Sequence, residues 1–281
     1  MANWVRAVTP RSMVLDLLRV AAPNEVSVRA LVDVGGMFGL EGNATRVALT
    51  RLISRGLVEP ARRGWYRLAA SAQPVNELVE EWRLGERRMT KWRGDWLAVW
   101  QPRVASRSAQ ARSVGALERL GFVAGPKPLW LRPNNLAPRV DGTRRRLVQL
   151  GLADDAEVFV MSELSTTLAE QIGGSWPAKT IRARLRKTAA DLRRSAARIN
   201  SLSHERALVE TFMLGGAAIR WLSVDPLLPE ELLNGDDRRA LTQQMLAYDK
   251  LGRDLWRQSI DRARLNATPS HLGVFAQEGA A

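Results

Sequence analysis

The sequence predicts a multidomain α+β fold, because three kinds of hydrophobic pattern follow one another along its 281 residues. Helices ending in a hairpin come first, alternating strands and helices come next, and only helices follow. Hydrophobic residues make up 46% of the chain, enough for several cores, and no cysteine is present to form disulfides or a thiolate zinc site. The expected parts are residues 1–70, a linker helix at 71–91, residues 92–161 and residues 162–281.

The first part reads as three helices and a hairpin. Apolar residues recur at helical spacing after Ser12, which can serve as an N-cap. Ser27 can cap a second helix, which we expect the Gly35–Gly36 pair to end. This order is typical of a winged helix-turn-helix. The expected helices cover residues 12–20, 28–36 and 43–55, and the expected strands cover residues 57–58 and 65–68.

The third of these helices has the character of a DNA recognition helix. Ala44, Leu49 and Leu52 can face a core, which leaves short polar groups and arginines on the outward side. Arginine can pair with guanine through two hydrogen bonds, and asparagine can do so with adenine. The tight turn of the hairpin adds two further arginines that could meet the DNA backbone or minor groove. The DNA-binding candidates are Asn43, Thr45, Arg46, Thr50, Arg51, Arg62 and Arg63.

The charge balance favours a polyanionic partner. Lysine and arginine number 42 against 29 acidic residues, a formal net charge of +13, and neutralising phosphates releases counterions. Two other interpretations stay open. The codon bias of a GC-rich genome enriches arginine by itself, and an acidic membrane surface is also a polyanion.

The connector and the middle part follow. Residues 71–91 are amphipathic and fit a linker helix or a dimer contact. The middle part predicts the order βαββαβ, which suggests a ferredoxin-like fold. The expected strands cover residues 96–100, 122–124, 129–131 and 157–161, and the expected helices cover residues 106–120 and 141–151.

The C-terminal part predicts only helices, at residues 176–200, 204–222 and 236–265. The weak candidates for binding an effector are Trp176, Arg220 and Trp221, because a flat aromatic group could stack on tryptophan. Core packing is the favoured alternative for both tryptophans. The arginines of residues 182–198 could meet phosphates, but a charge run of this kind is more often a solvated helix face.

Several stretches resemble the PaaX family of bacterial repressors. Residues 11–68, from RSMVLDLLRVA to RRGWYRL, are similar to its N-terminal winged-helix domain. The strand after the family's linker is similar to WRGDWLAVW, and a Trp- and Pro-marked segment of its ferredoxin-like middle domain is similar to GFVAGPKPLWLRPNNL. A signature of its helical C-terminal domain resembles DPLLPEELL. The resemblance covers nearly the whole chain and is less clear over residues 162–200.

This resemblance implies a dimeric repressor that binds a palindromic operator on double-stranded DNA. Arg46 matches the arginine that such recognition helices direct at DNA, with Asn43 and Thr50 beside it, whereas Thr45 stands where the family more often has an aliphatic residue. The best-known members repress phenylacetate catabolism and are released by phenylacetyl-CoA. The resemblance therefore suggests a catabolic operon and an aryl- or acyl-CoA effector, with no cofactor.

An enzyme is the weaker expectation. The middle part also resembles the small nuclease subunit of CRISPR adaptation complexes, which would suggest metal-dependent processing of nucleic acids. Such a nuclease needs a carboxylate at the end of its first strand, where this chain has Gln101, and Asp95 reads as a cap or surface acid. Neither histidine has a second ligand at metal spacing. With no apolar leader and no apolar run long enough to span a bilayer, we expect a cytoplasmic protein without membrane contact.

Overall fold

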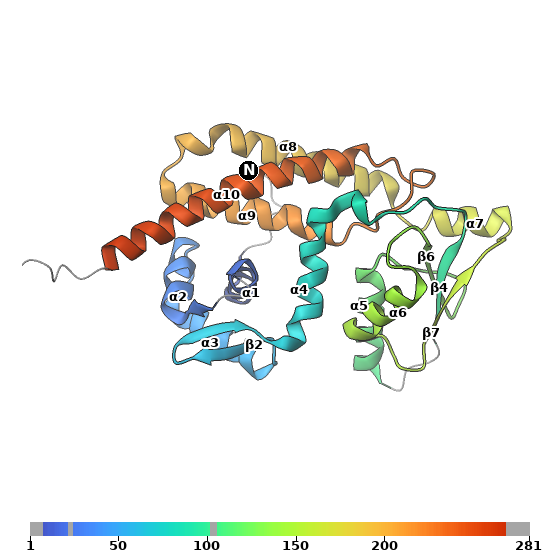
Figure 1. The fold of residues 1–281 in the computed structure, drawn as a ribbon, viewed down its shortest axis with the longest axis horizontal. Coiled ribbons are helices and arrows are strands. Elements are labelled where there is room, and N and C mark those ends of the chain that lie inside the picture. Colours follow the sequence, from blue (N-terminus) through green and yellow to red (C-terminus); the bar gives the residue numbers. More distant parts are fainter. Residues whose placement is uncertain (1–7, 22–24, 102–105, 268–281) are drawn as a thin grey trace, which may run out of the picture.

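The computed structural model describes residues 8–21, 25–101 and 106–267. Its elements form an α+β protein, as the sequence predicts. Three long helices lie together along one side of the molecule (Figure 1). The N-terminal region and a four-stranded sheet both lie on the other side, and the connector runs between them. The outer ends of the first and last predicted domains, residues 1–7 and 268–281, lie outside the described residues.

The N-terminal region packs three helices against a small antiparallel sheet. The sheet has the order β1-β3-β2, and a single core that includes Met13, Leu31 and Leu49 joins it to the helices. Its elements are α1 (Pro10–Ala21), β1 (Val26–Ser27), α2 (Val28–Met37), α3 (Gly42–Ser54), β2 (Val58–Arg62) and β3 (Trp65–Leu68).

Local details of this region differ from the prediction at three points. The first helix begins at Pro10 and is capped by Thr9, whose hydroxyl accepts a hydrogen bond from the Ser12 amide at 3.1 Å, so Ser12 is not the cap. Ser27 does cap α2, accepting from the Ala30 amide at 3.1 Å. That helix continues through the glycine pair and turns only at Gly39, whose φ is +72°. The two-residue strand β1 was not expected, because so short a segment carries no periodicity.

The connector is not one helix. It consists of the 3-10 turn η1 (Ala70–Ala72), the helix α4 (Gln73–Glu80) and the 3-10 segment η2 (Glu81–Arg88). Gly85, with φ of 50° and ψ of −131°, interrupts η2. A β-carbon at Gly85 would lie 3.2 Å from Thr242, so the chain turns there while passing close to the last helix.

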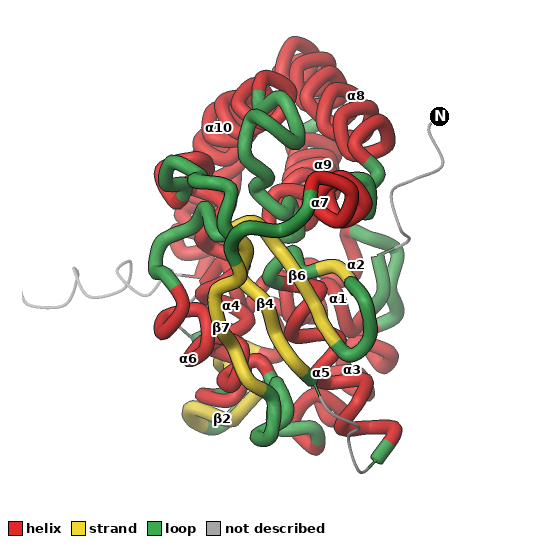
Figure 2. The backbone as a smooth tube through the Cα atoms, turned by 90° about the vertical axis from the view of Figure 1, so that its right-hand side faces the viewer, coloured by secondary structure: helices red, strands yellow, loops and turns green. Residues whose placement is uncertain are grey.

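The middle region has the element order βαββαβ, as expected. Its strands form an antiparallel sheet of order β5-β6-β4-β7. Both helices cover one face, where Leu97 and Val99 meet Leu117 and Leu147; the opposite face is seen in Figure 2. The elements are β4 (Trp96–Trp100), α5 (Arg107–Arg119), β5 (Val123–Ala124), β6 (Leu129–Pro133), α6 (Val140–Leu150) and β7 (Glu157–Met161).

The helical body follows, with a core that includes Leu192, Ala218 and Leu241. Trp82 of the connector is 2% exposed and belongs to this core, so the connector is anchored in the body. The elements are α7 (Thr166–Gly173), α8 (Ala178–Arg198), the 3-10 turn η3 (Ile199–Ser201), α9 (His204–Ser223) and α10 (Asp236–Ala267).

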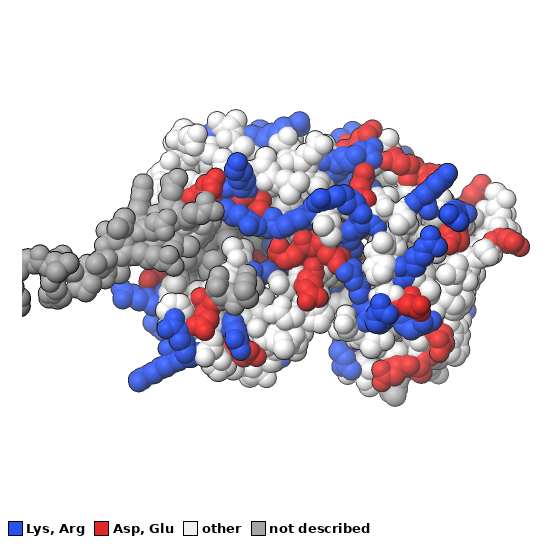
Figure 3. Space-filling view, in the orientation of Figure 1, with Lys and Arg blue, Asp and Glu red and all other residues white. Residues whose placement is uncertain are grey.

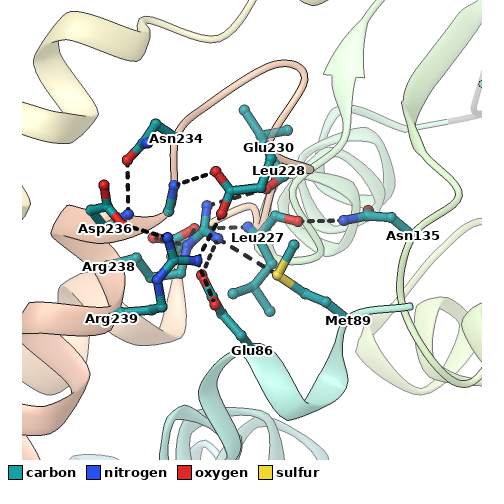
Figure 4. A network of polar contacts seen from close by, with 12 residues as sticks. Glu86, Met89, Asn135, Leu227, Leu228, Glu230, Asn234, Asp236, Arg238 and Arg239 are labelled. Carbon is teal, nitrogen blue, oxygen red and sulfur yellow. Dashed lines mark hydrogen bonds and ion pairs between the residues drawn. The ribbon is translucent and has the colours of Figure 1, made fainter. Parts of the chain in front are cut away.

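A buried polar joint connects the body with the connector. The side chains of Arg238 and Asp225 are 2% and 1% exposed, and the Arg238 guanidinium lies 3.2 Å from each oxygen of the Asp225 carboxylate. This guanidinium also donates to Glu86 of η2 at 3.0 Å and to the Leu228 carbonyl at 3.3 Å (Figure 4). Each interaction satisfies a charge that would otherwise be costly to bury.

The turn at residues 225–228, which contains Asp225 and Leu228, also contacts the middle region. Asn135 donates to the Leu227 carbonyl at 2.7 Å, and the buried Arg132 donates to the Pro226 carbonyl at 3.2 Å. Burial, together with the nearby charge of Arg88, lowers the pKa of Arg132 to about 9. The turn at residues 225–228 therefore joins all three: the connector, the middle region and the body.

Candidate nucleic-acid interface

Helix α3 is held in place from its inner side. Leu49 and Leu52 are 3% and 1% exposed and lie in the N-terminal core. Helix α2 crosses close to α3 at Gly35, where a β-carbon would lie 2.9 Å from the hydroxyl oxygen of Thr45. Close approach of the two helices at this glycine fixes the face that α3 presents to solvent.

The outward face of α3 carries the polar residues predicted for it. Asn43, Arg46, Thr50 and Arg51 are all exposed. Within the described residues, no ion pair involves Arg46 or Arg51. The Thr50 hydroxyl donates to the Arg46 carbonyl at 3.1 Å, so in this state it is turned back onto its own helix. The face combines two guanidinium groups with amide and hydroxyl groups, and these groups bind phosphates and base edges.

Thr45 does not belong to this face, which corrects its assignment as a DNA contact. It is 0% exposed and points at α2, and its hydroxyl is 3.4 Å from the Glu41 carbonyl. The reason is helical geometry, since residue 45 precedes the core residues Leu49 and Leu52 by four and seven positions. An aliphatic residue would suit this buried place equally well.

The hairpin turn holds the two remaining arginines, and both are exposed. Arg62 donates to Glu25 at 2.7 Å, and its guanidinium lies 4.0 Å from the centre of the Trp65 ring. In the described part of the chain, the Arg63 side chain makes no hydrogen bond or ion pair. Gly64, with φ of +75°, makes the tight turn. The hairpin and α3 lie at the end of the region that faces away from α8–α10 (Figure 1).

Arg55 extends this surface and was not predicted. It follows the last residue of α3, is exposed, and has no ion partner among the residues described. The sequence suggested only a helix end there, since an arginine before glycine is common at a helix C-terminus.

Arginines of the body behave differently. Arg182 and Arg186 of α8 both pair with Asp237, at 2.9 and 3.2 Å, and Arg198 pairs with Glu210 at 2.9 Å. Basic and acidic side chains intermingle over this part of the surface (Figure 3). The arginine run of α8 is thus a solvated, ion-paired helix face, as favoured from the sequence.

The effector candidates do not form one site. Trp176 is 6% exposed, stacks on Trp96 with ring centres 6.3 Å apart, and donates to the Gly121 carbonyl at 3.3 Å. It is a core residue, as favoured from the sequence, so the weaker assignment as an effector contact is wrong. Trp221 is half-buried beneath Arg184, whose guanidinium lies 3.9 Å from its ring centre, and Arg220 is exposed.

The positions considered for a nuclease have structural roles. The buried amide of Gln101 donates to Ser113 at 2.7 Å, and the Asp95 carboxylate accepts from Asn134 at 2.6 Å. Residues 8–21, 25–101 and 106–267 contain no group of three or more histidine, cysteine or acidic side chains placed to hold a metal ion. None of the helices described is long and apolar enough to cross a membrane.

The fold and this surface together define a multidomain α+β protein. Its N-terminal region exposes a helix whose arginines form no ion pair with the other described residues. Its residues 9–72 match the family model of the PaaX-like proteins, so the resemblance to that family is confirmed over the N-terminal region. The uncharacterized protein Rv0674 from Mycobacterium tuberculosis has a similar fold, with a TM-score of 0.54 and 22% identity over 88% of this chain and 99% of that one. No curated protein matches the sequence.

Proposed function

We propose that this chain is a sequence-specific DNA-binding regulator of transcription. In this proposal residues 1–70 form a winged helix-turn-helix, with α3 as the recognition helix and the β2–β3 hairpin as the wing. The helix-helix-helix-hairpin order and the PaaX-like match over residues 9–72 support it.

The observation that carries the proposal is the state of the arginines on α3. In a chain whose body arginines are largely paired with carboxylates, Arg46 and Arg51 stand exposed on a helix whose opposite side is locked into a core. A rigid helix with unpaired guanidinium groups can bind in the major groove, where arginine pairs with guanine O6 and N7. Asn43 lies at the start of the same helix, where adenine could be read.

The remaining assignments complete the proposal. Residues 92–161 form a ferredoxin-like domain, supported by the sheet order β5-β6-β4-β7 and by two helices on one face. Residues 71–91 link it to the DNA-binding domain, and residues 162–281 form the helical domain. The protein acts in the cytoplasm as a homodimer, which would place two recognition helices about one helical turn of DNA apart.

The regulator is proposed to repress a catabolic operon and to be released by a small effector such as an aryl- or acyl-CoA. This step is supported by the family match. Release requires only that the effector bind one arrangement of the dimer better than another.

Genome-wide mapping of bound sites would supply an operator, and competition binding would then test Arg46. The Arg46→Ala variant should keep its circular dichroism spectrum and lose about 10-fold or more of its preference for operator over random DNA, as expected for one two-bond base contact. Arg193→Ala, which removes an exposed arginine of α8, is the matched control and should keep that preference. Unchanged discrimination by Arg46→Ala would remove Arg46 as a base reader.

A further inference from the structure

A cavity of about 600 Å³ lies where the N-terminal region meets the helical body. Met37, at the end of α2, lines one side, and residues of α8, α9 and the turn between them line the other. Next to Met37, the ring of Phe38 lies 5.1 Å from that of Phe212 on α9, so the two regions touch at the rim. The size falls in the range of pockets that hold small molecules.

The cavity is apolar at one end. Met37, Met213 and Leu214 line it there, with Val209 one helical turn earlier on α9. All four side chains are half-buried, so they retain exposed apolar surface that a ligand could cover. Methionine side chains are flexible and polarizable and adapt to ligands of different shape. This end therefore suits an alkyl or aryl group.

The other end is polar and favours an anion. Ser203, the N-cap residue of the 20-residue helix α9, lines it and makes no side-chain capping bond, so the partial positive charge of the helix N-terminus lies at this end. Arg206, in the first turn, is exposed and has no ion partner among the described residues. A carboxylate or phosphate at this end would meet both the helix N-terminus and a free guanidinium group.

The acidic residues around the cavity leave this preference intact. The Glu210 carboxylate is already neutralised by Arg198 at 2.9 Å and accepts from the Ser195 hydroxyl at 2.5 Å. Glu205 also lines the cavity, but its side chain is exposed, so water and salt screen its charge. Along α9, the polar end near residue 205 and the apolar end near residue 213 are eight residues apart, or about 12 Å, close to the extended length of a medium-chain fatty acid.

We infer that this cavity binds the effector, an amphipathic anion with its apolar group between Met37 and Met213 and its anionic end at Ser203 and Arg206. The effect of this ligand on operator binding rests on the proposed function. A ligand here touches α2 two residues beyond Gly35, the residue that contacts α3. It therefore lies at the contact between the body and the element that supports the recognition helix, and can shift operator affinity by favouring one arrangement of the two.

Calorimetric titration of the full chain with octanoate, phenylacetate, octanoyl-CoA and neutral 1-octanol tests this site without DNA. Met213→Trp should fill the apolar end and weaken every probe at least tenfold. Arg206→Glu, a surface change that leaves the cores intact, should weaken the anionic probes at least tenfold and 1-octanol less than threefold. Arg193→Glu is the matched control and should bind all probes as the wild type does. The relative affinities of octanoate and octanoyl-CoA identify free acids or thioesters as the ligand source.

Failure of the cavity assignment and failure of the regulator proposal would give different results. Wild-type protein that binds operator but none of the four probes, or variants at residues 206 and 213 that bind probes like the wild type, would overturn the assignment of the cavity and leave the regulator proposal standing. Wild-type protein that binds the probes through these residues but prefers no DNA sequence would overturn the regulator proposal alone. In the expected case, octanoate or its thioester weakens operator binding at least fivefold, and Met213→Trp abolishes that response.

Discussion

The hydroxyl oxygen of Thr45 lies 2.9 Å from the point that a β-carbon at Gly35 would occupy. Residue 35 is thus a place where α2 lies close to α3, and the ε-carbon of Met13 closes the same space at 3.1 Å. The contact joins all three helices of the N-terminal region. It shows that the orientation of the proposed recognition helix depends on the absence of one side chain.

Gly35→Ala should destabilise the N-terminal region by about 1–3 kcal/mol, because an extra carbon in a packed core forces neighbours to move. The gain of up to about 1 kcal/mol in helix propensity offsets part of this cost. Urea unfolding followed by circular dichroism measures the change. Gly36→Ala is the control, since no atom lies within 4 Å of its added carbon; it should be neutral or slightly stabilising.

A double substitution sharpens this test. Thr45→Ala removes the oxygen that the new carbon would meet, so Gly35→Ala should cost less in the Thr45→Ala background than in the wild type. Equal costs in the two backgrounds would show that the two residues are not coupled.

Arg63 provides a prediction about salt. As an unrestrained cation at the hairpin turn, it is expected to meet phosphate, which carries no sequence information. Arg63→Ala should weaken operator and random DNA by similar factors and lower the slope of log affinity against log salt by about 1. Arg193→Ala, with the same loss of charge on α8, should leave the slope unchanged. A loss confined to operator DNA would instead make Arg63 a base reader.

Much of the architecture was predictable because it rests on local signals. Ser27 caps a helix through its own side chain, and the α+β order follows from changes of hydrophobic period. The outward placement of Asn43, Arg46, Thr50 and Arg51 follows from the 3.6-residue repeat alone.

What escaped prediction depends on tertiary contacts. Gly35 reads in the sequence only as part of a helix end, whereas in the fold the absence of its side chain makes room for Thr45 of α3. Core packing of Trp176 was favoured from the sequence, but its partners, the Trp96 ring and the Gly121 carbonyl, are set by the tertiary fold. The cavity joins Met37 to residues more than 160 positions away, so no sequence pattern could place it.

Asp225 should be among the residues most important for stability. It is the buried carboxylate that neutralises the buried Arg238, and removing one partner of such a pair leaves an uncompensated charge. Asp225→Asn is expected to cost about 3–5 kcal/mol. Glu230→Gln is the control, because Glu230 pairs with Arg239 at 2.7 Å at the surface, where the side chains are 52% and 41% exposed; it should cost less than about 1 kcal/mol. Comparable losses in urea unfolding for the two variants would contradict the assigned role of Asp225.

Tyr248 should make the stability of the helical body fall in alkaline solution. Its hydroxyl is 2.7 Å from that of Ser195, and burial raises its pKa from 10.0 to about 12. Because the unfolded chain releases this proton at lower pH than the folded chain, the free energy of unfolding decreases between about pH 10 and pH 12, and is unaffected by this group below pH 10. Tyr248→Phe cannot ionise, so its urea midpoint should fall less steeply over that range, although it starts lower by about 1 kcal/mol at pH 8 through the lost hydrogen bond. Parallel pH dependence of the two proteins would mean that the Tyr248 hydroxyl is as acidic in the folded body as in the unfolded chain.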